Sequence, residues 1–383
     1  MVSSAEHCVV FPKRLRIRRL VVATPTFDVA LRRAVSLVAV PLLATWHIFA
    51  IAAGAEPASS VAAPADFDAR KSAPGVIRWF DFDSASQLGR GDRANVGILP
   101  GTSTSPVIDT NVKASGAGSL RFDIPSRSSS NAAGAWFANF SSDLRTQFGE
   151  NTEFFIQWRQ RFNRAFIDTF FVESAANPER PQQGIKQAII TTGDTPSKVY
   201  HTCETTEVVV QSYYQYRFPI VYNSCTGSGS HGGFAGLYEK GPSYDFQLQN
   251  ARPGSCTYLQ AGKLGATVKA PAGCFNWVAD EWLTFQIGIK LGPRDNTNND
   301  FLESRVRLWG AREGQSSQLL VDWKPGVPGY FPLAAGPLSE NQKFGKIWLL
   351  PYMTTKEAAQ VHGLAQTWYD DLIISTKQIP DPK

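Results

Sequence analysis

Residues 154–162 (FFIQWRQRF) alternate between apolar and polar side chains. Phe154, Ile156, Trp158 and Phe162 fall on one side of a strand with this period, with Gln160 as the exception. The other side carries three long hydrogen-bonding side chains: Gln157, Arg159 and Arg161. The pattern predicts a half-buried strand whose polar row is either a substrate groove or a solvated surface.

The same alternation recurs along the chain. Residues 119–125 (SLRFDIP), 282–290 (WLTFQIGIK) and 305–309 (RVRLW) each pair an apolar side with a polar one. Residues 346–353 (KIWLLPYM) and 368–375 (WYDDLIIS) are more apolar throughout, as expected of central strands. Gly, Pro, Ser and Asn separate these short stretches, and helical periodicity is scarce. We predict an all-β protein, a two-sheet antiparallel β-sandwich.

The first 55 residues have the pattern of an export signal. A basic region (1–33) precedes an uncharged apolar run (34–53) that ends in Ala53-Gly54-Ala55. We expect a cleaved signal peptide over 1–55 and a secreted or periplasmic protein; an uncleaved membrane anchor is the alternative. A Pro-, Ala- and Ser-rich linker is expected over 56–75, and a single sandwich domain over 76–383.

The net charge of +5 comes from the leader. Seven of the 38 Lys and Arg residues and two of the 33 Asp and Glu residues lie in 1–55, so the remainder is formally neutral. This excludes nucleic-acid binding through a broadly basic surface, and an anionic substrate needs a local cationic cluster. We expect a monomer that binds neither nucleic acid nor, after cleavage, a membrane.

Four cysteines follow the leader, an even number that suits disulfides in an exported chain. They are Cys203, Cys225, Cys256 and Cys274. We favour pairing the first with the second and the third with the fourth, because each pair encloses a short segment. Zinc is the alternative, but no C-x-x-C or C-x-x-H spacing is present. No cofactor is expected, and a structural calcium ion stays open.

Common hydrolase motifs are missing. A retaining sandwich glucanase needs carboxylates about 5 Å apart from an E-x-D-x-x-E strand. Here Glu204 and Glu207 are three positions apart, and the adjacent Asp370 and Asp371 are expected on opposite faces. G-x-S-x-G in strand-to-helix context and H-E-x-x-H are likewise absent from the sequence.

The remaining Arg, Gln, Lys, Tyr and His inventory suits β-elimination on a uronate polysaccharide. Arg or Lys with Gln or Asn would neutralise the C5 carboxylate, and Tyr or His would move the proton. The chain has three His after the leader, two of them His201 and His231. His231 lies in a Gly-rich loop (223–246), where a surface histidine is the plainer interpretation.

The closing stretches KIWLLPYMTTK and TWYDDLIISTKQIPDP resemble the last strands of exported concanavalin A-like lectin and glucanase sandwiches, a superfamily that includes polysaccharide lyases. Alginate lyases of this type carry R-x-E-x-R, Q-[IV]-H and Y-F-K-A-G-x-Y-N-Q in order. This chain offers residues 157–161 (QWRQR), Lys186-Gln187 and YRFPIVYN with Tyr216, Tyr222 and Asn223. It departs from the pattern at Gln157, Arg159 and Ile189, which stand where the family has Arg, Glu and His.

We therefore expect a carbohydrate-active protein, with a polysaccharide lyase slightly preferred. The alternatives are a non-catalytic glycan-binding module and a structural envelope protein. The candidate catalytic residues are Arg161, His231 and Tyr222. The candidate substrate-binding residues are Gln157, Arg159, Lys186, Gln187 and Gln211.

Overall fold

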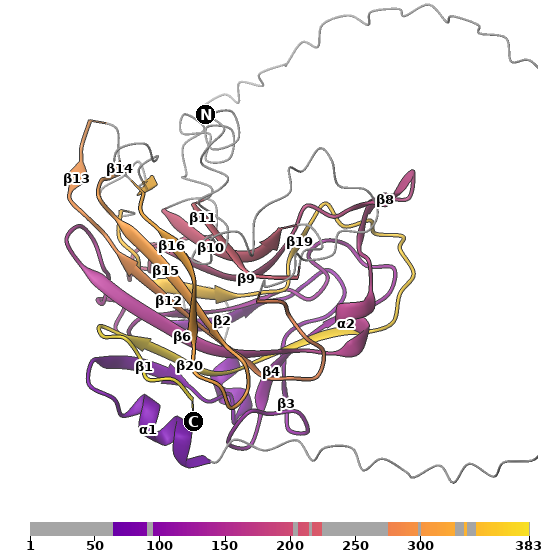
Figure 1. Ribbon diagram of the computed structural model, residues 1–383, viewed down its shortest axis with the longest axis horizontal. Helices are drawn as coiled ribbons and strands as arrows, with labels where there is room; N and C mark the ends of the chain where they lie inside the picture. Colours follow the sequence, from indigo (N-terminus) through magenta and orange to yellow (C-terminus); the bar gives the residue numbers. More distant parts are fainter. Residues whose placement is uncertain are drawn as a thin grey trace, which may run out of the picture. The chain divides into compact units, whose positions relative to one another are not determined.

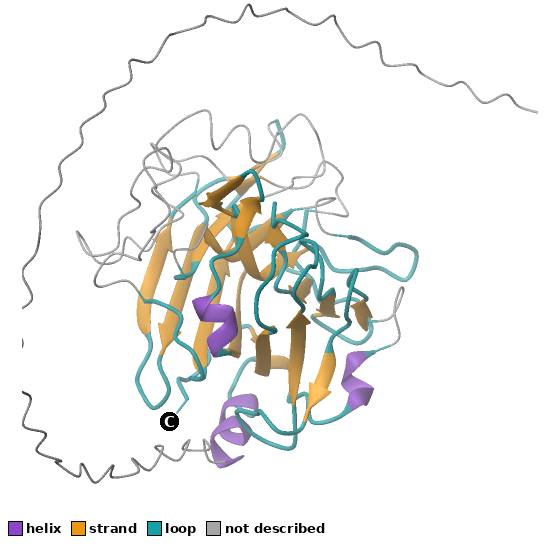
Figure 2. Ribbon diagram, turned by 90° about the vertical axis from the view of Figure 1, so that its right-hand side faces the viewer, coloured by secondary structure: helices purple, strands orange, loops and turns teal. Residues whose placement is uncertain are grey.

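The computed structural model describes residues 64–89, 95–201, 206–213, 217–223, 275–297, 300–325, 333–334 and 342–382. In this part of the chain, two antiparallel sheets pack face to face as a β-sandwich. Figure 1 shows the two layers, and Figure 2 shows that strands dominate over short helices. The predicted fold class is confirmed.

Sheet A is the eight-stranded sheet of the described residues. The yellow C-terminal strand β20 lies beside the magenta β6 in its middle, as Figure 1 shows. Central strands of a sandwich are buried on both sides, which explains the apolar character of β20. In order, sheet A contains β16 (Gln318–Trp323), β15 (Arg305–Ala311), β12 (Leu283–Lys290), β6 (Glu153–Phe162), β20 (Ala365–Ser375), β4 (Ser119–Ile124) and β3 (Val107–Asp109), with β1 (Val76–Phe80) paired to β20.

Sheet B is the seven-stranded sheet of the described residues. Its apolar strand β18 lies between β9 and β5, so the central position predicted for KIWLLPYM is confirmed. In order, sheet B contains β11 (Ile220–Asn223), β10 (Glu207–Tyr213), β9 (Gly184–Thr191), β18 (Lys346–Leu349), β5 (Ala135–Asn139) and β2 (Val96–Leu99), with β19 (Met353–Thr354) paired to β9.

The main core lies between the sheets and contains the apolar side predicted for β6. Phe154, Ile156, Trp158 and Phe162 are all buried there. Trp158 is fully buried, with its ring centroid 5.7 Å from that of Phe285 in the neighbouring β12. The alternation predicted for residues 154–162 is therefore confirmed on its apolar side.

Helix α1 (Pro64–Lys71) lies within the expected linker, so that prediction is wrong for residues 64–71. Pro suits the first helical position, and Asp66 and Arg70 form an ion pair one turn apart at 2.9 Å. Phe67 packs in an apolar cluster with Phe155 and Ile379. Phe67 attaches this segment to sheet A, a contact that its Pro, Ala and Ser content does not reveal.

The other described elements are short. A 3₁₀ helix precedes β2, and a five-residue helix follows β6. The helix after β6 begins after Asn163, whose side chain accepts a hydrogen bond from the backbone N–H of Phe166. These elements are η1 (Ala85–Leu88), α2 (Arg164–Asp168), β7 (Val172–Ser174), β8 (Asn177–Pro181), β13 (Arg294–Asp295), β14 (Asp300–Phe301) and β17 (Leu333–Ala334).

Candidate functional site

The polar row of β6 is covered by other parts of the same chain. Gln157 is fully buried and Arg159 is 2% exposed. Arg70 of α1 donates to the Gln157 side-chain oxygen at 2.7 Å, and Gln157 donates to the Pro380 carbonyl at 3.0 Å. Both sequence interpretations, an open groove and a solvated face, are therefore wrong for these two residues. They hold α1 and the C-terminal tail against sheet A.

Gln286 of β12 is paired directly with Gln157 and also binds the C-terminal tail. Its side chain donates to the Ile379 carbonyl at 3.1 Å and accepts from the Ile379 N–H at 2.8 Å. By making both bonds, the buried side-chain amide of Gln286 pairs the backbone N–H and carbonyl of Ile379 in the C-terminal tail. The two glutamines thus explain why the outer side of sheet A carries long polar side chains.

Arg159 belongs to a buried ionic cluster. Its guanidinium lies 3.9 Å from the Asp371 carboxylate and 3.6 Å from Glu313. Burial lowers the pKa of Arg159, and the nearby carboxylates offset part of that effect. Arg161, the next residue of the row, is 19% exposed at its side chain and lies 3.5 Å from Asp280. These residues occupy the outer side of sheet A.

Asp370 and Asp371 do not separate onto opposite faces as expected. Asp371 has a positive φ of 50°, and the pairing of β20 with β6 is irregular here. Asp370 accepts a 3.3 Å hydrogen bond from the Ser115 N–H, while Asp371 accepts from the Ser115 hydroxyl. Burial and the neighbouring Asp371 charge raise the pKa of Asp370 well above its ordinary value. The expectation failed because a bulge breaks the alternation of side chains.

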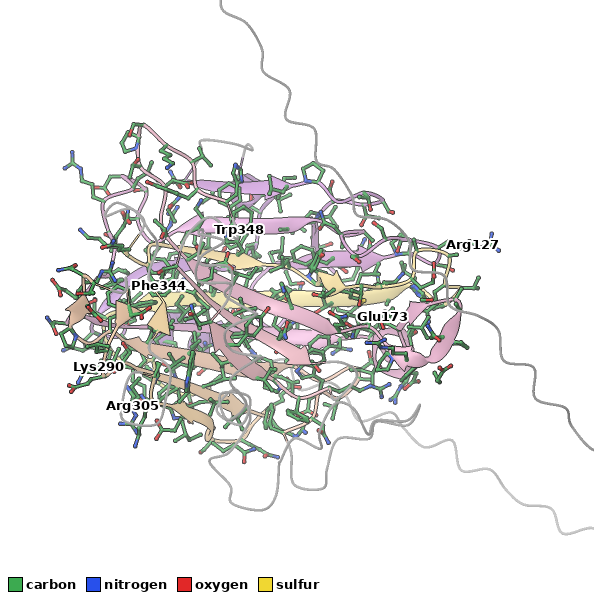
Figure 3. All side chains as sticks on the ribbon, turned by 90° about the horizontal axis from the view of Figure 1, so that it is seen from above. Arg127, Glu173, Lys290, Arg305, Phe344 and Trp348 are labelled. Atoms are coloured by element: carbon green, nitrogen blue, oxygen red, sulfur yellow. The ribbon has the colours of Figure 1, made fainter. Side chains whose placement is uncertain are left out.

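Sheet B brings Lys186, Tyr222 and Gln211 together on its outer face, the side away from the main core. A paired row across this face runs through Tyr222, Val209, Ile189, Trp348 and Phe137. These five side chains form an apolar cluster separate from the main core. Gln211, two residues after Val209 in β10, is paired with Lys186 of β9. In Figure 3, the β18 ribbon that carries Trp348 lies apart from the strands of sheet A that carry Lys290 and Arg305.

The centre of the candidate site is the contact between Lys186 and Tyr222. The Lys186 ammonium donates to the Tyr222 hydroxyl oxygen at 3.0 Å. The same ammonium lies 5.7 Å from the Tyr222 ring centroid and 5.5 Å from that of Tyr352. Burial works against the charge of Lys186, but the attraction and hydrogen bond of the Tyr222 oxygen, with Glu207 adding to them, raise the pKa of Lys186 above its ordinary value. Lys186 is therefore a cation.

Gln187 points away from this pair. The pairing of β9 with β10 shifts register here, which turns Gln187 toward the interior between the sheets. Its amide nitrogen donates to the Gln160 side-chain oxygen at 2.9 Å, and Tyr369 donates to its backbone carbonyl at 2.9 Å. Burial raises the pKa of Tyr369 well above its ordinary value. Gln187 thus belongs to a polar group in the core rather than to a substrate-binding surface.

The outer face also carries an ionic group that sequence reasoning missed. Lys346 of β18 binds the Asp194 carboxylate and donates to the Tyr200 carbonyl at 2.7 Å. Asn139 of β5, which is paired with Lys346, donates to Asp194 at 3.2 Å. The sequence did contain a sign of this ionic group: the charged Lys346 shares one side of an otherwise apolar strand with Trp348.

Several predicted residues lie outside the described residues. They are His231, Tyr216, Cys203, Cys225, Cys256 and Cys274. Within the described ranges, no group of three His, Cys, Asp or Glu side chains could hold a metal ion. A search of the same ranges finds no helix with the length and apolar character needed to cross a membrane.

No protein-family model and no curated protein matches this chain. Among solved structures, it is similar to the PL-14 alginate lyase from Aplysia kurodai, with 12% identity, a TM-score of 0.46, and coverage of 79% of this chain and 99% of that one. Alginate lyase Aly36B shows 12% identity and a TM-score of 0.34 over 69% and 83%. The catalytic domain of the glycoside hydrolase family 131 protein from Coprinopsis cinerea shows 11% identity and a TM-score of 0.31 over 81% and 98%. The contacts described above, rather than these likenesses, bear on function.

Proposed function

We propose that this protein is a polysaccharide lyase that cleaves a uronate-containing glycan by β-elimination at Lys186 and Tyr222. The observation that carries the proposal is the 3.0 Å contact between the Lys186 ammonium and the Tyr222 oxygen on the outer face of sheet B. A cation beside a phenol oxygen supplies the two functions that this elimination needs: an offset for the carboxylate and a group that moves a proton.

Lys186 is assigned to the carboxylate because its pKa is raised and it therefore stays charged. An ammonium has three N–H donors, and Tyr222 accepts one of them. The other two N–H groups of the ammonium can donate to a uronate carboxylate. As the C5–H bond breaks, negative charge spreads onto that carboxylate, and a fixed cation stabilises the transition state more than the ground state.

Tyr222 is assigned to proton transfer. In β-elimination the C5 proton leaves, the C4–O4 bond breaks, a C4–C5 double bond forms and the departing O4 gains a proton. The step requires Tyr222 with its oxygen deprotonated: that oxygen takes the proton from C5 and returns it to O4, so the base is regenerated and atoms and charges balance without a cofactor. Gln211, paired with Lys186, is assigned to substrate hydrogen bonding.

A glycan-binding module without activity is the second candidate. The aromatic row that it would use is buried, and Tyr222 in the same row is 2% exposed, so the cleavage assay rather than burial separates the two candidates. A flat sugar platform needs exposed aromatic side chains. Trp348 is 2% exposed and Phe137 is 1% exposed. The most exposed Trp of the described residues is Trp79 at 39%, and its ring packs edge-on against Phe67 of α1, away from sheet B.

Export belongs to the same proposal. The basic and apolar leader before Ala53-Gly54-Ala55 supports secretion of a chain that begins near Glu56 and meets polysaccharide outside the cytoplasm. Intact-mass measurement of the secreted protein tests this, because a retained leader would oppose it.

The activity is tested by incubating the protein with a panel of uronate and neutral polysaccharides, including alginate, and recording ultraviolet absorbance. An unsaturated uronate absorbs, whereas products of hydrolysis do not. We expect absorbance to rise with at least one uronate polymer and with no neutral one. Cleavage without an absorbance change would indicate hydrolysis and would overturn the proposed chemistry.

A further inference from the structure

The direction in which Lys186 points does not follow from the regular alternation of side chains in β9. Ala188 points into the main core, and Ile189 belongs to the apolar cluster of the outer face. Continued alternation would turn Gln187 outward and Lys186 into the core. The structure has the reverse, because the Gln187 side chain lies between the sheets and the Lys186 ammonium lies on the outer face. A change of period between these residues therefore decides where Lys186 points.

A β-bulge in β9 makes this change. Val210 of β10 is paired with Ala188 of β9. The next residue of β10, Gln211, is paired with Lys186. Gln187 is thus the extra residue, and a bulge disrupts the ladder of hydrogen bonds at such a residue. Because Gln187 is buried, its backbone needs other partners.

Sheet A supplies these partners through the core. The Tyr369 hydroxyl of β20 donates to the Gln187 carbonyl at 2.9 Å, whereas the Leu350 N–H donates to the same carbonyl at 3.4 Å. Burial raises the pKa of Tyr369 well above its ordinary value, so its hydroxyl keeps the proton that it donates. The Gln187 side chain donates to the Gln160 side-chain oxygen of β6 at 2.9 Å. Two strands of sheet A therefore bind the residue next to Lys186.

The core polar group extends one contact further. The Gln160 amide nitrogen donates to the Thr367 hydroxyl at 3.1 Å, and Thr367 donates to the Arg161 carbonyl at 2.9 Å. The side chains of Gln160, Gln187, Thr367 and Tyr369 are at most 1% exposed. Within the described chain, the Gln187 side-chain oxygen has no hydrogen-bond partner, so stability alone does not favour a glutamine here. A buried polar group does fix one arrangement of its strands.

We propose that three core residues hold the bulge of β9 and thereby keep Lys186 beside Tyr222. These positioning residues are Tyr369, Gln160 and Gln187. Their role rests on the proposed function and extends it to side chains that no substrate touches. Loss of their hydrogen bonds should let β9 relax toward regular alternation, which moves Lys186 away from Tyr222.

The test uses Tyr369→Phe, which removes the hydroxyl and keeps the ring. One measurement needs no activity: the pKa of Lys186, from NMR of isotope-labelled lysine side chains, with its signal identified by its absence in Lys186→Gln. The Tyr222 oxygen raises this pKa, so the pKa should fall in Tyr369→Phe. The second measurement is kcat with a uronate polymer. It should fall about tenfold, the usual effect of one buried hydrogen bond on a choice between two arrangements.

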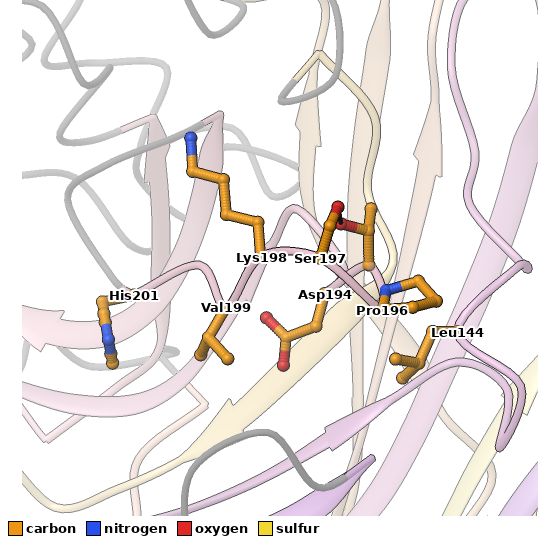
Figure 4. A pocket seen from close by; sticks show the side chains of 8 residues that line it. Leu144, Asp194, Pro196, Ser197, Lys198, Val199 and His201 are labelled. Atoms are coloured by element: carbon orange, nitrogen blue, oxygen red, sulfur yellow. Dashed lines mark hydrogen bonds between the residues drawn. The ribbon is translucent and has the colours of Figure 1, made fainter.

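Two controls separate positioning from a general loss of stability. Val306→Ala trims a buried side chain of the main core in β15, three strands from β20, and should lower the melting temperature without changing either measurement. Lys198→Ala alters the chain beyond the opposite end of β9, where Lys198 lines a pocket of about 430 Å³ (Figure 4). Neither Lys186 nor Gln187 lines that pocket, so both measurements should again stay unchanged.

The outcomes separate the positioning role from the lyase activity. A Lys186 pKa that stays raised in folded Tyr369→Phe overturns the positioning role, and unchanged kcat despite a lowered pKa overturns its part in catalysis. If Tyr369→Phe does not fold, Thr367→Val decides in the same way, because it removes the hydroxyl that binds Gln160. If the wild type cleaves no uronate polymer but the pKa still falls in the variant, the positioning role stands and the lyase proposal fails.

Discussion

Arg70 and Asp371 form an ion pair at 2.6 Å although 301 positions separate them in the chain. Arg70 is 2% exposed and Asp371 is fully buried. The pair joins helix α1 to the bulge of β20 in sheet A. Because Arg70 also binds Gln157, which holds the Pro380 carbonyl, the beginning and the end of the described chain meet at one buried cluster, as Figure 1 shows.

Replacing Arg70 with Ala should destabilise the fold by about 3–5 kcal/mol, because Asp371 would remain buried with its main partner removed. Denaturant unfolding of the full chain measures the change. Arg145→Ala is the control, since that side chain is 88% exposed and lies 3.9 Å from Asp143. Its cost should stay below about 1 kcal/mol. Equal effects of the two substitutions would show that α1 adds little to the fold.

Asp370 should make stability depend on pH. Its folded-state pKa is raised by burial and by Asp371, so the folded state holds a proton that the unfolded state releases near the ordinary value of 3.8. The free energy of unfolding of the wild type, relative to Asp370→Asn, should therefore fall as pH rises above about 4. Urea unfolding at a series of pH values measures it.

Asp143→Asn is the control, because the contribution of Asp143 to the free energy of unfolding should change with pH in the opposite direction. Hydrogen bonds from the Ser141 hydroxyl and the Arg145 N–H lower the pKa of Asp143. The wild type relative to this variant should therefore lose stability as pH falls below about 4. Parallel curves for the two variants would contradict the assignment of a retained proton to Asp370.

The sequence predicted those parts of the fold in which alternation is regular. In β4 the inward positions Leu120, Phe122 and Ile124 are buried as expected. The prediction failed where a bulge changes the period, at Asp371 in β20 and Gln187 in β9. A one-residue shift reverses every later side chain, and nothing in the local composition announces it.

The candidate site was predicted in part. Tyr222 and Lys186 were both named from motif positions, but their 3.0 Å contact depends on the order of β9, β10 and β11 in sheet B. The surroundings of Arg159 were predicted wrongly for a different reason. Whether a polar strand face meets solvent or another segment depends on a helix more than 80 residues earlier, whose Arg70 reaches Gln157 at a separation of 87.

Trp158→Ala should destabilise the fold by about 3–5 kcal/mol through the cavity that it leaves. The indole is fully buried in the main core beside Phe285. Val361→Ala is the control, because Val361 is 69% exposed and should change stability by less than about 0.5 kcal/mol. Thermal or denaturant unfolding compares them. A small effect of Trp158→Ala would mean that the core closes around the missing ring.

Tyr222→Phe should reduce turnover by about 10²–10⁴-fold, the usual range for removing a proton-transfer group. The ring stays in place in its apolar cluster, so the melting temperature should change little. Arg161→Ala is the control for turnover, since Arg161 lies on the outer side of sheet A and contacts Asp280. Tyr222→Phe with unchanged turnover would remove Tyr222 from the mechanism.

Lys186→Ala should lower kcat by about 10²–10³-fold, because the charge that develops on the carboxylate would lose its fixed partner. Lys186→Gln keeps a hydrogen-bond donor of similar length without the charge, so it separates the electrostatic effect from the contact with Tyr222.

The pH dependence of turnover gives an independent check on the role of Lys186. The pKa of Lys186 is raised above 10.5, so its ammonium is present at all lower pH values and is lost only as pH rises through the raised value. The contribution of Lys186 to catalysis, taken as the ratio of wild-type to Lys186→Gln kcat, should therefore stay constant from neutral pH to about 10. A ratio that falls between pH 7 and 9 would mean that Lys186 loses its proton there, against its raised pKa. A ratio that rises over this range would mean that the neutral amine is the active form, and Lys186 would then be the base instead of the carboxylate partner.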